Sequence, residues 1–220
     1  MAFWRRPRTA ADQRRTGPIG EEPWWDPDDQ AFAEQPLLTR ADLGKGWQAV
    51  EIPGNAERLD PYGDDPDSEA IRAVRAQRRL TALDEGHAWR VRTAGVLAVS
   101  RVEIFADADH AAHRTAWQEH GAACLDAVWR ARWRERDRLP GWIEVRRRPE
   151  LSTDAVDWLT VEDQTGSEQS GSVTLYEHVT IWSGRAVCTY TVRHDLADDR
   201  VDATAAAAAT IAARLGALDG

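Results

Sequence analysis

The order of hydrophobic and polar residues along the chain changes between two periods, one typical of strands and one typical of helices. Alternation with a period of two predicts strands, because successive side chains of a strand point to opposite faces. The predicted strands cover residues 47–52, 87–93, 96–105, 142–148, 156–161, 173–182 and 185–194. Helical spacing predicts helices over residues 39–44, 67–83, 107–136 and 199–215.

Two short turns join four of these strands into hairpins. Ala94-Gly95 separates the second predicted strand from the third, and Ser183-Gly184 separates the last two. Hairpin strands are antiparallel neighbours, and the predicted helices are grouped between them along the chain. The pattern predicts an α+β fold, with an antiparallel β-sheet built from hairpins and α-helices packed on it.

The first 35 residues show no sustained period. Residues 1–19 are rich in arginine, and residues 20–35 are acidic and interrupted by proline. Segments of this kind bury too little apolar surface to offset the entropy lost on ordering. We expect residues 1–35 to form a mobile N-terminal arm, anchored only through Trp24 and Trp25. Residues 36–220 then form a single α+β domain.

The second hairpin predicts which side chains share a face of the sheet. A turn at Ser183-Gly184 pairs Trp182 with Arg185 and so sets the register. One face is then apolar and forms the core: Val173, Leu175, Glu177, Val179, Ile181, Ala186, Cys188, Tyr190 and Val192. The opposite face carries Tyr176, His178, Thr180, Trp182, Val187, Thr189, Thr191 and Arg193.

That opposite face has two interpretations. It is an ordinary solvent-exposed face, since strands favour Thr and Tyr, or it is a ligand-binding surface of aromatic and hydrogen-bonding groups. In the second interpretation the ligand contacts five side chains, with Trp182 as an anchor outside the core. These are Tyr176, His178, Thr180, Trp182 and Arg193.

Glu177 falls within the predicted core face and lies opposite Tyr190 in this register. Three explanations stay open. The Tyr190 hydroxyl donates a hydrogen bond to a buried carboxylate, the carboxylate acts in catalysis, or a β-bulge turns Glu177 outward.

The longest predicted helix carries a stripe of potential metal ligands. His113, Trp117, His120 and Cys124 recur at spacings of three or four residues. Imidazole and thiolate bind zinc, but the stripe has no third ligand at short spacing and coincides with the apolar helix face. We therefore expect core packing and no metal. Cys124 and Cys188 both point toward the predicted core, where they could be neighbours, and we expect buried reduced thiols.

Composition excludes several classes of protein. The net charge of −9 opposes binding to nucleic-acid phosphates. No apolar stretch reaches the length of a membrane span, and the basic N-terminus lacks the apolar segment of a signal peptide, so we expect a cytoplasmic protein. Lys45 is the only lysine beside many arginines, which indicates a high-GC genome. Eleven tryptophans favour extensive core packing or an interface.

Three segments resemble the sensor-type α+β domains of actinobacterial lipoproteins and receptor kinases. They are LLTRADLGKGW at Leu37–Trp47, VEIFADADHAAHRTAWQEHGAACLDAV at Val102–Val128, and the alanine-rich helix after Asp199. The resemblance spans residues 36–216 and implies an extracytoplasmic domain, usually disulfide-bonded, that binds ligands or partners in a cleft. This chain differs from that family because it shows no export signal.

No nucleophile elbow, P-loop, dinucleotide-binding glycine motif or zinc-protease motif is present. We therefore expect a non-enzymatic binding domain, without a cofactor, for a small apolar or amphipathic ligand or a protein partner. A homodimer is one possible assembly. The alternative is a small cofactor-independent hydrolase or isomerase that uses Glu177 or a helix histidine as its general base.

Overall fold

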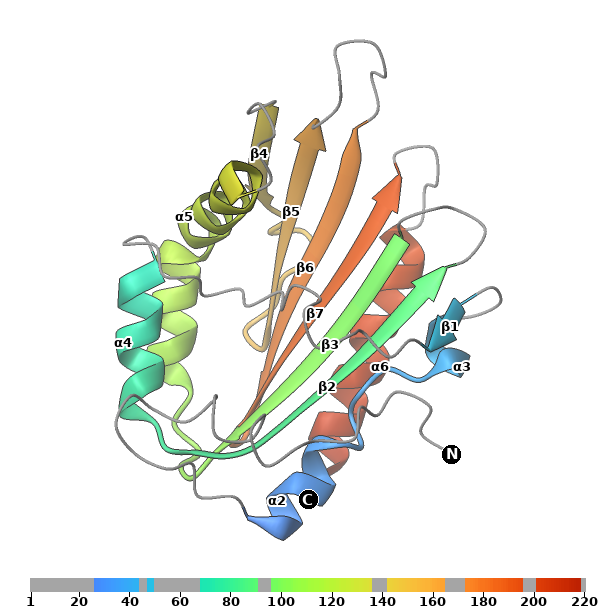
Figure 1. Ribbon diagram of the computed structural model, residues 1–220. Coiled ribbons are helices and arrows are strands. Elements are labelled where there is room, and N and C mark those ends of the chain that lie inside the picture. The colour runs from blue at the N-terminus through green and yellow to red at the C-terminus, as the bar shows by residue number, and fades with distance from the viewer. Residues whose placement is uncertain are drawn as a thin grey trace.

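Seven strands form one antiparallel sheet at the centre of the molecule (Figure 1). The computed structural model describes residues 26–43, 47–49, 68–90, 96–135, 142–164, 173–195 and 201–218. The strands are β1 (Trp47–Ala49), β2 (Leu80–Arg90), β3 (Val96–Phe105), β4 (Trp142–Arg147), β5 (Val156–Gln164), β6 (Thr174–Ser183) and β7 (Ala186–Asp195). Their order in space is β1-β2-β3-β7-β6-β5-β4, and each neighbouring pair is antiparallel. The predicted α+β class and antiparallel sheet are confirmed.

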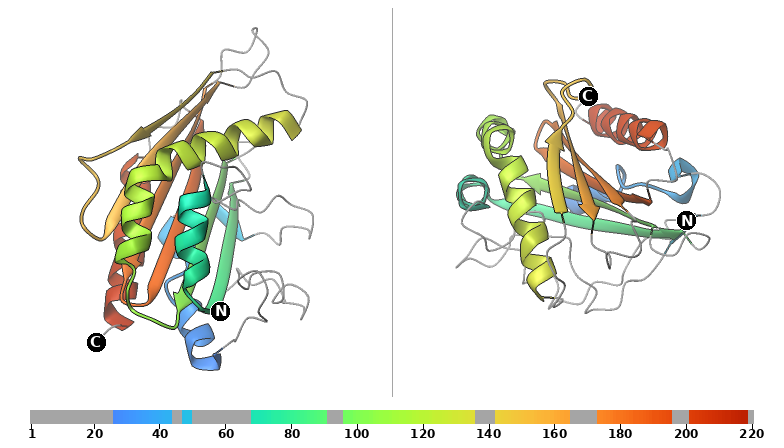
Figure 2. Two further views of the ribbon diagram at one scale, coloured as in Figure 1. Left: turned by 90° about the vertical axis from the view of Figure 1, so that its left-hand side faces the viewer. Right: turned by 90° about the horizontal axis from the view of Figure 1, so that it is seen from above.

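Helices cover both faces of the sheet. They are α2 (Pro27–Ala33), α3 (Arg40–Leu43), α4 (Glu69–Gln77), α5 (Ala111–Glu135) and α6 (Val201–Leu218). Figure 2 shows α4 and α5 on one side of the sheet and α6 on the other. We call these two sides the α5 face and the α6 face. Each side has its own apolar core, with Trp117 and Leu125 of α5 in one and Ile211 and Leu215 of α6 in the other.

The hairpin of β6 and β7 turns one residue later than the sequence predicts. Ser183 pairs with Ala186 and Trp182 with Val187, so the two turn residues are Gly184 and Arg185. Gly184 has a φ of 48°, a left-handed conformation that glycine adopts without steric cost. The error moves each cross-strand partner by two positions. The predicted membership of the two faces is therefore correct, while the predicted pairing of Trp182 with Arg185 is wrong.

The helix predicted over residues 67–83 is too long at its C-terminal end. The helix α4 ends at Gln77, and Arg78 adopts an extended backbone that leads directly into β2 at Leu80. Leu80–Arg90 pairs with β3, and Leu80 and Leu83 are buried in the α5-face core. Tertiary pairing overrides the helical spacing of this stretch.

Part of the predicted mobile arm is folded. Asp26 caps α2 by accepting hydrogen bonds from the amides of Asp28 and Asp29, and Pro27 occupies the first turn, where it costs no hydrogen bond. The buried carboxylate of Asp29 pairs with Arg185 at 3.0 Å, and Ala33 enters the α6-face core. Residues 26–35 therefore belong to the folded domain. Trp24 and Trp25 lie outside the described residues.

Smaller differences concern the ends of elements. β5 continues to Gln164, whereas the predicted strand ends at residue 161. Residues 50–52 of the first predicted strand lie outside the described residues. The helix α6 continues to Leu218, so Gly216 lies inside the helix and is not its C-cap. The predicted turn at Ala94-Gly95 lies outside the described residues.

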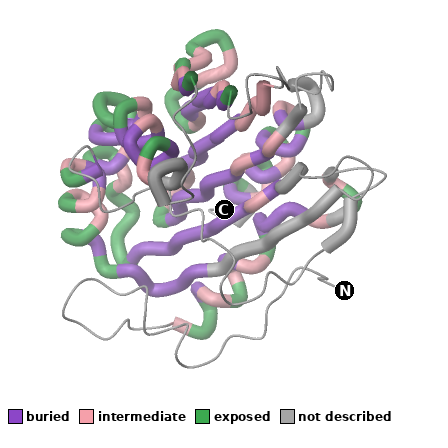
Figure 3. The backbone as a smooth tube through the Cα atoms, turned by 45° about the horizontal axis from the view of Figure 1, so that its top comes forward, coloured by how far each residue is buried: buried purple, intermediate pink, exposed green. Residues whose placement is uncertain are grey.

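Figure 3 shows buried backbone concentrated along the middle of the sheet and the helix sides that contact it.

Candidate binding site

The five side chains predicted to bind a ligand all lie on the α5 face of β6 and β7. At one end of this row the α5 helix covers the sheet completely. Thr180 has no exposed surface, and Trp182 is 2% exposed within the α5-face core. The prediction that Trp182 lies outside the core is therefore wrong. Polar strand residues are buried here because a second helical layer packs over them.

Trp182 is held by a specific contact with α5. Its indole Nε1 donates a hydrogen bond of 3.0 Å to Nδ1 of His113, which is 1% exposed. An indole nitrogen can only donate, so Nδ1 of His113 must be unprotonated in this arrangement. Burial accordingly lowers the pKa of His113 to about 4. The imidazole is a neutral acceptor in the core.

At the other end of the row most of the side chains are only partly buried. Tyr176 and Arg193 are cross-strand neighbours, as are His178 and Thr191. Tyr176, Thr191 and Arg193 are all partly exposed, and His178 is 5% exposed. We call these four residues, with Trp129 of α5, the Tyr176 cluster.

The Tyr176 cluster combines aromatic, cationic and hydroxyl groups. The rings of Tyr176 and Trp129 are 4.2 Å apart between centroids, and the guanidinium carbon of Arg193 lies 5.9 Å from the Tyr176 ring centroid. His178 Nδ1 and Thr191 Oγ1 are hydrogen-bonded at 2.8 Å. The Nε of Arg193 is buried and has no hydrogen-bond partner among the residues that the structure describes. The cluster therefore offers a guanidinium with one unsatisfied N–H donor beside an aromatic surface.

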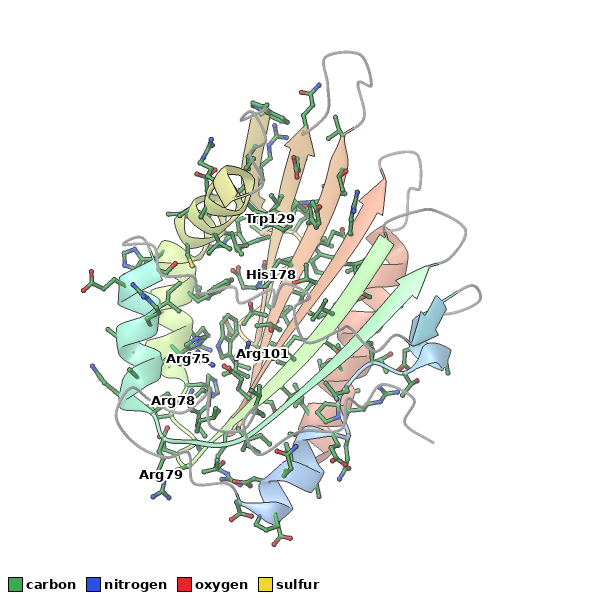
Figure 4. The ribbon with its side chains drawn as sticks, viewed as in Figure 1. Arg75, Arg78, Arg79, Arg101, Trp129 and His178 are labelled. Atoms are coloured by element: carbon green, nitrogen blue, oxygen red, sulfur yellow. The ribbon has the colours of Figure 1, made fainter. Side chains whose placement is uncertain are left out.

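A buried ion cluster lies on the same face, on β3 and α4. Glu103 accepts hydrogen bonds from Arg101 at 2.8 Å and 3.1 Å, and Arg75 of α4 binds the same carboxylate from the helix side. Burial alone would raise the pKa of Glu103, but the two guanidinium groups outweigh it and lower the pKa to about 2. Figure 4 shows Arg101 and His178 on the same face of the sheet, with Arg75 and Trp129 approaching from the helices.

The shape of α5 determines which part of the face is covered. The helix bends midway along its length (Figure 2). Near the middle, Arg147 of β4 donates hydrogen bonds to the backbone carbonyls of Trp117 and Gln118, and it forms an ion pair of 3.0 Å with the buried Asp157. A side chain that donates to helix carbonyls and a glycine are both recognised causes of helix bending. Arg147 and Gly121 together account for the bend.

Gly121 is also required by close packing. A β-carbon at this position would lie 2.9 Å from the ring of Trp117, which is fully buried. We expect Gly121→Ala to destabilise the protein by ~1–3 kcal/mol, because the indole must move within a packed core. Gly216→Ala in α6 is the matched control, since its β-carbon meets nothing within 4 Å. The control should be stabilising by ~0.5–1 kcal/mol, and urea denaturation of both variants measures the difference. Equal effects of the two substitutions would contradict the packing argument.

The residues proposed as general bases lie away from the Tyr176 cluster. Glu177 has no exposed surface, is paired with Val192 without a bulge, and faces α6. Tyr190 is paired with Val179, not with Glu177, and burial raises the pKa of its hydroxyl. The predicted bulge and the predicted Glu177–Tyr190 pairing are both wrong. Of the helix histidines, His113 is the buried acceptor already described, and the side chain of His120 is 47% exposed.

The cysteines are free and buried, as predicted, but they are not neighbours. Cys124 lies in the α5-face core, where its thiol is 3.0 Å from the hydroxyl of Ser68, and Cys188 lies in the α6-face core. The sheet separates them. Burial raises the pKa of Cys188 to about 12, which leaves its thiol unreactive at neutral pH.

The part of the chain that the structure describes contains neither a cluster of metal ligands nor a membrane-spanning helix. No three His, Cys, Asp or Glu side chains there gather closely enough to hold a metal ion. None of the described helices is long and apolar enough to cross a membrane. No protein-family model matches the chain, and no curated protein matches its sequence. The fold and the Tyr176 cluster are therefore the basis for any functional assignment.

Proposed function

We propose that this protein is a non-enzymatic binding domain that holds a small amphipathic ligand at the Tyr176 cluster. The observation that supports it concerns Arg193, a residue that is partly exposed. Its Nε is buried with no hydrogen-bond partner among the described residues, and it lies beside two packed aromatic rings. A buried donor without an acceptor costs free energy, which a ligand acceptor would recover.

The chemistry of the cluster indicates the ligand. The rings of Tyr176 and Trp129 offer a contact for an apolar or planar part. Arg193 favours a carboxylate, sulfonate or phosphate group, because a guanidinium matches such groups in charge and geometry. The hydrogen-bonded pair of His178 and Thr191 adds polar groups beside them. Trp182 and Thr180 do not contact the ligand in this proposal, because α5 covers them.

Binding of an anionic aromatic probe tests this proposal. We expect 1-anilinonaphthalene-8-sulfonate to bind the folded protein, and Arg193→Glu to weaken that binding at least ~tenfold by replacing attraction with repulsion. Arg79→Glu carries the same charge change on an exposed residue at the end of α4, away from Trp129 and His178 (Figure 4). This control should leave the dissociation constant within about twofold, since the site is not altered. Fluorescence titration measures both. Equal weakening in the two variants, or no change in either, would overturn the proposal.

A protein partner is the other occupant consistent with the cluster, and native mass spectrometry of the purified chain distinguishes the two. A copurified small molecule that is lost in Arg193→Glu supports the proposed ligand. A copurified polypeptide lost in the same variant would assign the cluster to a protein interface instead.

A further inference from the structure

The outer edge of β4 has backbone groups that no described strand satisfies. β4 is the last strand of the sheet and pairs only with β5 among the residues that the structure describes. The amide of Arg148 donates to the carbonyl of Trp158, its register partner. Hydrogen-bonded pairs alternate along an antiparallel ladder, so Trp142, Glu144 and Arg146 also bond to β5. The backbone groups of Ile143, Val145 and Arg147 therefore point away from the sheet.

An exposed strand edge is a template for another strand. Natural edges are protected by charged side chains, and β4 carries Glu144 and Arg146, which pair with each other along the strand. Their charges are opposite, and they lie two positions apart in the sequence. These charges oppose pairing with an apolar strand. They are complementary to a second copy of β4 in antiparallel orientation, where each charge faces its opposite.

We propose that β4 pairs with β4 of a second copy of this chain, around a two-fold axis at Val145. In this register the outward backbone groups of Val145 bond to Val145 of the second copy, and those of Ile143 bond to Arg147. Glu144 then lies directly opposite Arg146 of the second copy, and this contact occurs twice. The two seven-stranded sheets become one continuous sheet.

Other symmetric registers are disfavoured by charge. An axis at Glu144 would also use the outward backbone groups of Ile143 and Val145, but it would place two carboxylates directly opposite each other, which is destabilising. An axis at Arg147 would place Arg146 opposite Arg148, which are both cations. The axis at Val145 satisfies the outward backbone groups and gives opposite charges at both flanking positions.

The apolar surface of the edge agrees with this register. Trp142 is the large hydrophobic side chain that is exposed within the described ranges, at 45%. In the proposed pair it lies opposite Arg148 of the second copy, and indole and guanidinium groups attract each other. Both copies present α5 on the same side of the joined sheet. The pair is small, which places it among interfaces with dissociation constants on the order of micromolar.

Charge reversal in separate chains tests the register. We expect the wild type to show a concentration-dependent monomer–dimer equilibrium in analytical ultracentrifugation. Glu144→Arg places Arg opposite Arg146, and Arg146→Glu places Glu opposite Glu144, so each variant alone should dimerise at least ~tenfold more weakly. A mixture of the two variants restores opposite charges at both contacts and should form a heterodimer with an affinity close to that of the wild type.

Arg79→Glu is the control for a change of net charge and should leave the equilibrium unchanged. Circular dichroism confirms that each variant is folded. A wild type that stays monomeric at the highest accessible concentration would overturn the proposal. A dimer that persists in both single variants, or a mixture that fails to associate, would also overturn it, because the contact would then lie elsewhere.

Discussion

Trp182→Ala should lower the free energy of unfolding by ~3–5 kcal/mol, the range for removing a large aromatic side chain from a core. The side chain is 2% exposed and packs in the α5-face core with Phe105, Val187 and Leu159. Its removal leaves a cavity under α5, and the Nδ1 of His113 loses the donor that satisfies it. Both effects raise the free energy of the folded state and leave that of the unfolded state unchanged. Urea denaturation followed by circular dichroism measures the loss.

Two further variants separate the contributions. Trp182→Phe keeps most of the packing but removes the N–H donor, so it should cost ~1–3 kcal/mol. Trp142→Ala removes an indole that is 45% exposed and should change stability by at most ~0.5 kcal/mol, as surface substitutions do. If Trp182→Ala were as stable as Trp142→Ala and lost only ligand binding, then Trp182 would be a binding residue and the burial argument would fail.

The case of Trp182 shows what the sequence can and cannot predict. Alternation along residues 173–194 correctly assigns each side chain to one of two faces, because a strand has a strict period of two and the turn error preserved it. Whether a face is covered depends on a helix that is distant in the sequence, since His113 and Trp182 are 69 residues apart. Thr180 and His178 favour a strand equally well beneath a helix or in water, so their residue types alone could not distinguish the two.

The same limit explains the errors elsewhere. The segment from Leu80 to Leu83 follows a helical spacing, and only its pairing with β3 makes it a strand. The stripe on α5 was predicted to include His120, but the helix bends and His120 turns to the surface. The two cysteines each point into a core, and the sequence contains no sign that there are two cores.

The candidate site was only partly predictable. The sequence placed Tyr176, His178 and Arg193 on one face of the sheet, and the structure confirms this placement. Their role in binding stays a prediction. Trp129 was missed as a member of the cluster, because its contact with Tyr176 joins a helix to a strand far along the chain. Trp129 packs on the partly exposed Tyr176 beyond the bend of α5, and the signal for that bend lies in Gly121 and Arg147 jointly.

Glu103→Gln should destabilise the protein by ~3–5 kcal/mol, the range for breaking a buried ion pair by removing one partner. Glu103 is 3% exposed, and the guanidinium groups of Arg101 and Arg75 both bind its carboxylate. Glutamine keeps the size of the side chain and one acceptor oxygen, but it leaves the buried Arg101 and the partly buried Arg75 with no negative charge between them. Glu144→Gln is the control, because Glu144 and its partner Arg146 lie at the surface, where such pairs contribute ~0–1 kcal/mol.

The pH dependence of stability tests the contribution of Glu103 more specifically than the loss of stability at neutral pH does. The pKa of Glu103 is lowered from 4.5 to about 2 in the folded state, so its stabilisation is complete above pH 4.5 and is lost as the pH falls toward 2. The pKa of His113 is lowered from 6.5 to about 4, so folding is also destabilised as the pH falls from 6.5 toward 4, where the unfolded state binds a proton that the folded state excludes.

The wild type should therefore lose stability on acidification in two successive ranges. Each range has an amplitude on the order of 3 kcal/mol, because both groups are buried and their shifts are large. Glu103→Gln should make the slope in the lower range shallower, because a glutamine has no proton to bind. Asp29 and Asp42 should keep part of this slope, because an arginine beside each lowers its pKa despite burial. The decline that begins at pH 6.5 should remain, because the pKa of His113 is lowered mainly by burial. Urea denaturation at a series of pH values measures both slopes. A variant whose stability still falls as steeply as that of the wild type below pH 4 would show that carboxylates other than Glu103 dominate acid unfolding.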